Sequence, residues 1–390
     1  MRCFEWLSGE LEELHDSYLL RRLATIDSCP SPRVSIEGEQ KLLLCSNNYL
    51  GLAADPRVIR AAMVATEKYG AGAGAARLIS GNMPVHTVLE EAIARFKGTE
   101  AALLFSTGYM ANTGLLGTLC KKGDVIFCDR LSHASIIDGC TLSSARMVRY
   151  RHNDMAHLEF LLQKTSGNRK WIVTEGVFSM DGDMAPLPEL LGLAGRYDAV
   201  VILDEAHATG VLGQGGRGTV EYFGCRSDRI IFMGTLGKAL GGFGAYVAGE
   251  RVVIDYLLNK ARSFIFTTAL PPAVAASAME ALHIVESEPG RVERLRKNAV
   301  TLRQGLQKMG FDVPPGETPI IPVLIGDAEK ALALSKALFL EGVYAMAVRP
   351  PTVPKGESRI RVTVMATHTD EDIRFALEAF ERAGRKVGLP

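Results

Sequence analysis

The 390-residue sequence lacks a surplus of either charge, because lysine and arginine total 44 and aspartate and glutamate also total 44. Binding the phosphates of a nucleic acid or an anionic membrane surface needs a basic excess. We therefore expect no nucleic acid and no membrane among the partners of this chain, and a small-molecule substrate instead.

Long apolar runs and paired cysteines are also missing. Residues 1–20 have scattered charges and no apolar core of signal-peptide length. The longest uncharged run, Ala101–Cys120, contains three glycines and several polar side chains, which favours a buried strand and helix over a membrane span. The seven cysteines form no CxxC pair. We expect reduced thiols, no metal site and a cytoplasmic location.

What the sequence does contain is typical of a folded enzyme of two domains. Hydrophobic residues make up 47% and charged residues 23%, so disorder is not expected. Between about residues 100 and 250, short β-rich runs alternate with helical stretches, which predicts an α/β fold with a mostly parallel, seven-stranded sheet covered by helices on both faces. The predicted strands are Ala101–Phe105, Val125–Cys128, Met147–Tyr150, Trp171–Thr174, Ala199–Leu203, Ile230–Met233 and Gly244–Ala248.

The two ends of the chain have a different pattern. Residues Leu11–Ala24 predict an amphipathic helix. After Pro271 and Pro272, long helical stretches enclose short strands near Ile321–Leu324, Tyr344–Ala347 and Ile360–Thr363, which predicts a smaller α+β domain. We expect an N-terminal helical segment at 1–45, a large domain at 46–275 and a small domain at 276–390.

Asp204 and Lys238 are the strongest candidates for chemistry. Each follows a predicted strand, and ligands of open α/β sheets bind beyond the carboxyl ends of the strands. A lysine there can form an imine with an aldehyde cofactor such as pyridoxal phosphate (PLP), and a carboxylate can keep the pyridine nitrogen protonated. Taken alone, the pair could equally be a structural salt bridge.

Polar groups after other strands strengthen the candidate site. Thr235 and the segment 106–109 could meet a phosphate, the latter through the N–H groups at a helix start, although Thr107 could instead simply cap that helix. His133 could stack on a cofactor ring or be a packing residue. Glu175 and Ser179 follow another strand, in what could also be only a loop. Five strand ends that present polar groups to one edge favour a shared site.

Two motifs suggest other functions and are rejected. DEAH at 204–207 resembles a helicase signature, but the GxxxxGK[ST] loop that such an enzyme needs is missing upstream. The glycines of 213–218 match GxGxxG, but they lie several residues beyond their strand, so we expect a flexible loop and not a dinucleotide site.

Seven segments carry a joint signature: CSNNYLGLAADPRV (45–58), GAGAGAARLISGN (70–82), DRLSHASIIDG (129–139), TEGVFSMDGDMAPL (174–187), DEAHATGVLGQGGRG (204–218), GTLGKALGG (234–242) and RPPTVPKGESRIRVTVMATHT (349–369). In residues and order they resemble the α-oxoamine synthases, PLP-dependent transferases of fold type I, the aspartate-aminotransferase-like fold. The resemblance implies that fold and PLP as cofactor.

It also implies roles for single residues. Lys238 would hold PLP and act as general base, Asp204 would pair with the pyridine nitrogen, and His207 would contact the phenolic oxygen. His133 would stack on the ring. Further cofactor contacts would come from Gly108, Tyr109, Glu175, Ser179 and Thr235.

The implied substrate contacts lie elsewhere in the chain. Asn47 and Arg361 would bind the carboxylate of the amino acid, and Arg21 and Thr352 would meet the acyl substrate, with His133 also facing the substrate. Members of the family are homodimers with the active site at the interface, so the resemblance implies a homodimer.

Within the family, the resemblance is strongest to the branch that condenses L-alanine with pimeloyl-CoA or a pimeloyl carrier-protein thioester. The products are 8-amino-7-oxononanoate, CoA and CO₂, in biotin biosynthesis. SHASIIDG and GVFSMDG also occur in the glycine-using 2-amino-3-ketobutyrate CoA ligases, which stay an alternative, whereas DEAH and RPPTVP favour the alanine branch. Because the chemically essential residues Lys238, Asp204, His133 and His207 are intact, we do not expect a silent partner subunit.

Overall fold

The computed structural model describes residues 3–21 and 23–390, and the chain divides into two compact units. Unit 1 comprises Met1–Ser46 and Arg296–Pro390, and unit 2 comprises Asn47–Leu295. The first predicted segment, 1–45, thus shares a compact unit with the end of the chain. Helix α11 (Pro272–Ser287), which crosses the predicted boundary at 275, packs on helices of unit 2. The three-segment division stays a prediction about folding units.

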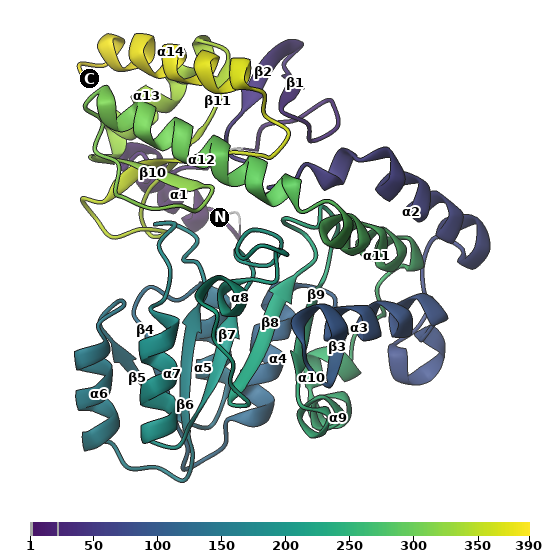
Figure 1. Cartoon of the computed structure of the whole chain (residues 1–390). Coiled ribbons are helices and arrows are strands. Elements are labelled where there is room, and N and C mark those ends of the chain that lie inside the picture. Colours follow the sequence, from purple (N-terminus) through teal and green to yellow (C-terminus); the bar gives the residue numbers. More distant parts are fainter. Residues whose placement is uncertain (1–2, 22) are drawn as a thin grey trace. The chain divides into compact units, whose positions relative to one another are not determined.

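Unit 2 is built on a seven-stranded sheet in the order β3-β9-β8-β7-β6-β4-β5 (Figure 1). Strand β9 runs antiparallel to both of its neighbours, and the other pairs are parallel. The prediction of a mostly parallel, seven-stranded sheet is therefore confirmed. The strands are β3 (Ala101–Phe105), β4 (Val125–Asp129), β5 (Arg146–Tyr150), β6 (Lys170–Glu175), β7 (Ala199–Asp204), β8 (Ile230–Thr235) and β9 (Ala245–Gly249).

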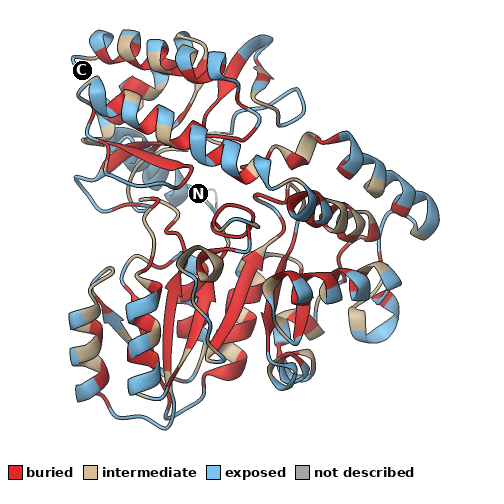
Figure 2. Ribbon diagram, in the orientation of Figure 1, coloured by how far each residue is buried: buried red, intermediate tan, exposed pale blue. Residues whose placement is uncertain are grey.

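Helices cover this sheet, and most of its strand residues are buried (Figure 2). Strands buried on both faces need continuous apolar runs, and runs such as that of β7 made them visible in the sequence. One layer of the core joins strand residues to α4 (Gly108–Leu119), α5 (Ala134–Leu142), α9 (Arg251–Lys260) and α10 (Arg262–Ile265). The other helical elements of the unit are η1 (Leu52–Ala54), α2 (Pro56–Tyr69), η2 (Arg77–Gly81), α3 (Pro84–Lys97), α6 (Met155–Lys164), α7 (Leu187–Arg196) and α8 (Thr219–Phe223).

Unit 1 contains two three-stranded sheets. One has the order β1-β2-β11 and the other β10-β13-β12. Their strands are β1 (Arg33–Ile36), β2 (Glu39–Leu43), β10 (Ile320–Gly326), β11 (Val343–Tyr344), β12 (Met346–Val348) and β13 (Ser358–Thr363). The helices are α1 (Trp6–Asp16), α13 (Ala328–Leu340) and α14 (Asp370–Lys386), together with most of α12 (Gly290–Lys308). Within the described part of the chain, no helix has the length and apolar character needed to cross a membrane.

Two predicted elements of unit 1 were wrong in detail. The predicted helix Leu11–Ala24 instead covers Trp6–Asp16, because Tyr18 has a left-handed φ of 59° and ends the helix; residue 22 lies outside the described residues. The predicted strand Tyr344–Ala347 is two strands, since β11 pairs with β2 and β12 with β13. Apolar periodicity alone could not show this change of partner.

Candidate active site

The predicted amine and carboxylate lie at one edge of the large sheet. Asp204 is the last residue of β7 and is in register with Met233 of the neighbouring parallel strand β8. Lys238 lies in the turn that follows β8, with its Nζ 2.9 Å from Nε2 of His207. Parallel strands end at the same edge, where open α/β sheets bind their ligands. Three of the predicted catalytic residues are thus gathered there.

Asp204 is a buried carboxylate with neutral hydrogen-bond donors. Asp204 is only 4% exposed. The backbone N–H of Ala206 donates to Oδ1 at 2.8 Å, and the side-chain amide of Asn112 donates to Oδ2 at 2.9 Å. Neither donor neutralises the negative charge, and a buried charge is stabilised best by an opposite one. This carboxylate therefore suits a cationic ring nitrogen.

A chain of hydrogen bonds leads away from Lys238. His207 Nδ1 lies 2.7 Å from the hydroxyl of the fully buried Tyr49, and that hydroxyl lies 3.1 Å from Oδ1 of Asn47. If the Tyr49 hydroxyl donates its hydrogen to the Asn47 oxygen, the same hydroxyl accepts from Nδ1–H of His207. Nε2 of His207 then carries no hydrogen and accepts from the amine of Lys238.

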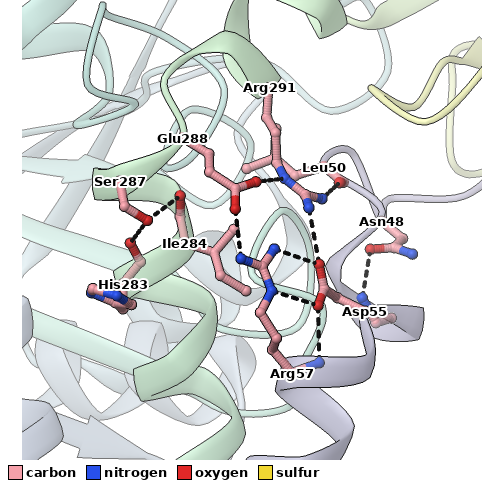
Figure 3. Close-up of polar contacts among 10 residues, drawn as sticks. Asn48, Leu50, Asp55, Arg57, His283, Ile284, Ser287, Glu288 and Arg291 are labelled. Carbon is pink, nitrogen blue, oxygen red and sulfur yellow. Dashed lines mark hydrogen bonds and ion pairs between the residues drawn. The ribbon is translucent and has the colours of Figure 1, made fainter.

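Four alternating charges fasten the segment that carries Asn47 and Tyr49 (Figure 3). The Asp55 carboxylate accepts from the guanidinium groups of Arg57, at 3.0 Å, and Arg291, at 2.9 Å. Glu288 accepts from the same two groups, at 2.6 and 2.7 Å. Arg291 also donates to the carbonyl of Leu50 at 3.3 Å. These bonds hold the segment against the start of α12.

The first turn of α4 lies directly after β3. Thr107 caps this helix, because its hydroxyl accepts from the N–H of Met110 at 3.1 Å. The capping role considered from the sequence is thus confirmed. Gly108 and Tyr109 form the first turn, where N–H groups lack partners within the helix and suit an anion. The Tyr109 hydroxyl meets the carboxylate of Asp138.

Thr235 ends β8 and shapes the turn that carries Lys238. Its hydroxyl donates to the carbonyl of Gly244 at 3.0 Å and accepts from the N–H of Gly237 at 3.1 Å. The structure therefore gives Thr235 a local role in the turn, and its predicted contact with a phosphate stays a prediction.

His133 and Glu175 meet across two neighbouring strands. The N–H of His133 donates to Oε1 of Glu175 at 2.6 Å, and the His133 ring caps α5 by accepting from the N–H of Ser135 at 3.2 Å. Burial, followed by the charge of Asp204, raises the pKa of Glu175 well above its usual range. Glu175 thus holds the backbone of His133, and its predicted cofactor contact stays a prediction. Ser179 lies in the loop after β6.

Three of the predicted substrate residues belong to unit 1. Arg21 donates to the hydroxyl of Thr352 at 3.2 Å, so the two residues expected to meet the acyl substrate lie together. Arg361 is buried on β13, opposite Pro322 and Met346. Their contacts with a substrate stay predictions.

Backbone N–H groups in and beside the glycine loop 213–218 donate to carboxylates of the chain itself. The N–H of Gly215 donates to Glu221 at 3.1 Å, and the N–H of Thr219 donates to Glu205 at 3.0 Å. Glu205 also accepts from the buried Lys97 at 2.9 Å. These amides therefore donate to carboxylates of the chain itself and are not directed at a dinucleotide, and the flexibility expected of the loop stays a prediction.

Sequence reasoning missed Tyr49 and Asn112. Tyr49 lies inside the quoted segment 45–58, but nothing in the spacing relates it to His207, which is 158 positions away. Asn112 could have been found, because it lies one helical turn beyond Gly108 and can face the same edge of the sheet. An asparagine in a helix carries no other signal of a function.

Comparison with known proteins extends these findings. The family model for class I and II aminotransferases matches residues 39–380. The 8-amino-7-oxononanoate synthase of Geobacter sulfurreducens is 53% identical over 98% of this chain and 99% of its own length. That of Trichlorobacter lovleyi is 51% identical, with 98% of both chains covered.

Solved structures share the fold. A serine palmitoyltransferase from S. paucimobilis with bound PLP and myriocin superposes with a TM-score of 0.94 at 37% identity, covering 99% of this chain and 98% of that one. An 8-amino-7-oxononanoate synthase from Francisella tularensis superposes with a TM-score of 0.76 at 31% identity, covering 89% of this chain and 98% of that one. The predicted aspartate-aminotransferase-like fold is confirmed.

Proposed function

Because this chain belongs to the class I and II aminotransferase family and, within it, to the 8-amino-7-oxononanoate synthases, we propose that it makes 8-amino-7-oxononanoate for biotin biosynthesis from L-alanine and a pimeloyl thioester. The thioester would be carried by coenzyme A or by a carrier protein. The observation that carries the proposal is the meeting of Lys238 with His207 beside the buried carboxylate of Asp204.

PLP is the cofactor of this enzyme, and the residues at the ends of β7 and β8 fit it. Bound PLP supplies an aldehyde for an amine and a protonated ring that withdraws electrons from the Cα of the amino acid. Lys238 offers the amine. Asp204, which accepts from the neutral amides of Ala206 and Asn112, offers the negative charge that keeps a ring nitrogen protonated.

Lys238 would also move the proton. The amine of Lys238 would take the proton from Cα of alanine, and the Cα electrons would then attack the thioester carbonyl, which breaks its C–S bond and expels the thiol of coenzyme A or of the carrier protein. Loss of CO₂ places negative charge at the same carbon, so one arrangement of charges serves both steps. His207, at 2.9 Å, would orient the amine and hold the phenolic oxygen of the cofactor.

His133 would cover the ring, since it stands at the start of α5 with its backbone fixed by Glu175. Asn47 and Arg361 would bind the carboxylate of alanine, a task for which the paired donors of arginine are well suited. Arg21 and Thr352, which already share a hydrogen bond, would meet the acyl chain.

The test is thiol release by purified protein loaded with PLP. Pimeloyl-CoA should release CoA with L-alanine much faster than with glycine or L-serine, and palmitoyl-CoA should be a poor donor. A clear preference for glycine would favour the ligase alternative and contradict the proposal. A pimeloyl carrier-protein thioester, supplied at equal concentration, decides which carrier is used.

We further propose a cytoplasmic homodimer. No side chain of α1 is buried, and large apolar side chains such as Trp6 (63% exposed), Ile79 (81%) and Phe266 (71%) face outward. Exposed apolar surface of this kind suits a second copy of the chain. Light scattering should give twice the chain mass; Ile79→Asp should lower that mass, and a monomeric wild type would contradict the dimer.

A further inference from the structure

A charged histidine lies beside the edge strand β5. His152 follows this strand, with Nδ1 2.9 Å from Oδ1 of Asp129 and Nε2 2.7 Å from Oδ2 of Asp183. An ionised carboxylate accepts hydrogen bonds and donates none, so both ring nitrogens must donate. An imidazole that donates from both nitrogens carries a positive charge.

Each of the two acids also accepts a further N–H, from Asn153. The backbone N–H of Asn153 donates to Asp129 at 3.0 Å, and its side-chain amide donates to Asp183 at 2.7 Å. Asp129 is fully buried. His152 and Asn153 therefore form one junction between two acids that lie 54 positions apart in the sequence.

Asp129 begins the loop that presents His133. It is the last residue of β4, and its Oδ1 accepts from the N–H of Leu131 at 2.8 Å. Its carbonyl accepts from the N–H of Ser132 at 3.2 Å. The conformation of this loop thus depends on the position of the Asp129 side chain, which His152 fixes.

Asp183 closes the loop that presents Ser179. Its carbonyl accepts from the N–H of Phe178 at 2.9 Å, and the Phe178 ring meets the His152 ring edge-on at 4.4 Å between centroids. Val177 and Met184 pair across the base of the loop. His152 therefore contacts this loop through a charge and through an aromatic ring.

We propose that His152 is a positioning residue of the proposed reaction, locking the loop 130–133 and the loop 176–184 in the arrangement that presents His133 and Ser179 to the cofactor. The proposal rests on the proposed function for its consequence in catalysis. The lock itself rests on the contacts of His152, Asp129 and Asp183.

The experiment compares His152→Gln with the wild type and with His283→Gln, an exposed histidine on α11, as matched control. Hydrogen exchange followed by mass spectrometry is measured with and without PLP, together with the dissociation constant of PLP. In His152→Gln, we expect amides of both loops to exchange at least about tenfold faster and PLP to bind at least about tenfold more weakly, since breaking a buried ion pair costs more than 1.4 kcal/mol. The control should match the wild type.

Unchanged loop exchange and PLP affinity in His152→Gln would overturn the proposal, as would faster exchange throughout unit 2 with unchanged PLP affinity. If His152→Gln does not fold, Asp183→Asn takes its place, because it keeps the shape and removes one charge. If the wild type binds no PLP, the proposed function fails, and loop exchange alone then decides whether the lock exists.

Discussion

At the scale of single residues, the site depends on a negative charge kept away from water. Two amide hydrogen bonds hold the Asp204 carboxylate, at 2.8 and 2.9 Å. Two unit charges about 4 Å apart at an effective dielectric near 20 attract by roughly 4 kcal/mol, enough to keep a pyridine nitrogen protonated at neutral pH.

Asp204→Asn should therefore retain PLP but lose most turnover. The amide keeps the size of the side chain but not its charge. The loss of about 2–4 kcal/mol of transition-state stabilisation predicts a rate lower by about 30- to 1000-fold. The measurement is kcat with alanine and pimeloyl-CoA, alongside the PLP content. Undiminished turnover at full PLP content would refute the role of Asp204.

The charge of His152 makes a prediction about pH. Asp129 and Asp183, which face its two nitrogens, raise the pKa of His152 to about 10 despite partial burial. Since the folded pKa lies above the unfolded value, this stabilisation is fully present below about pH 6.5 and is lost as the pH rises through 10.

The difference in unfolding free energy between the wild type and His152→Gln should thus shrink by about 1.4 kcal/mol per pH unit between those values. Urea unfolding at several pH values from 6 to 10 measures it. A difference that stays constant over this range would mean that His152 is neutral in the folded protein.

At the scale of elements, the junction of α11, α12 and the segment before α2 is held by alternating charges. Arg291 is the half-buried member that contacts both acids and the Leu50 carbonyl. Arg291→Gln should lower stability by about 1.5–3 kcal/mol, because the buried Asp55 loses a charged partner. Thermal unfolding measures the effect, with Arg294→Gln on the exposed side of α12 as control. Equal effects of the two substitutions would contradict the account.

The same scale shows what could be predicted from the sequence. Most strands of the large sheet could be predicted because strands buried on both faces are largely apolar, although the edge strand β5 has two exposed arginines. Polar residues after five of the strands marked the edge of the site. The split between β11 and β12 could not be predicted, because hydrogen bonding to two different sheets leaves no trace in apolar periodicity. Nor could the early end of α1, which depends on the left-handed Tyr18.

At the scale of the whole molecule, the sequence resemblance and the structure indicate the same chemistry, but they identify different residues. The motifs indicated Lys238, Asp204 and His207 one by one, and the fold brings them to one edge. Tyr49 and His152 became visible only in three dimensions, because their partners lie far away in the sequence. Residues that only position other side chains do not react themselves, so no catalytic motif points to them.

The central claim is that Lys238 is the residue that carries PLP. Borohydride reduction of the purified holoprotein, followed by peptide mass spectrometry, tests it most directly. We predict one reduced PLP adduct, on the peptide that contains Lys238, and none in Lys238→Ala. An adduct on a different lysine, or one that persists in Lys238→Ala, would contradict the account.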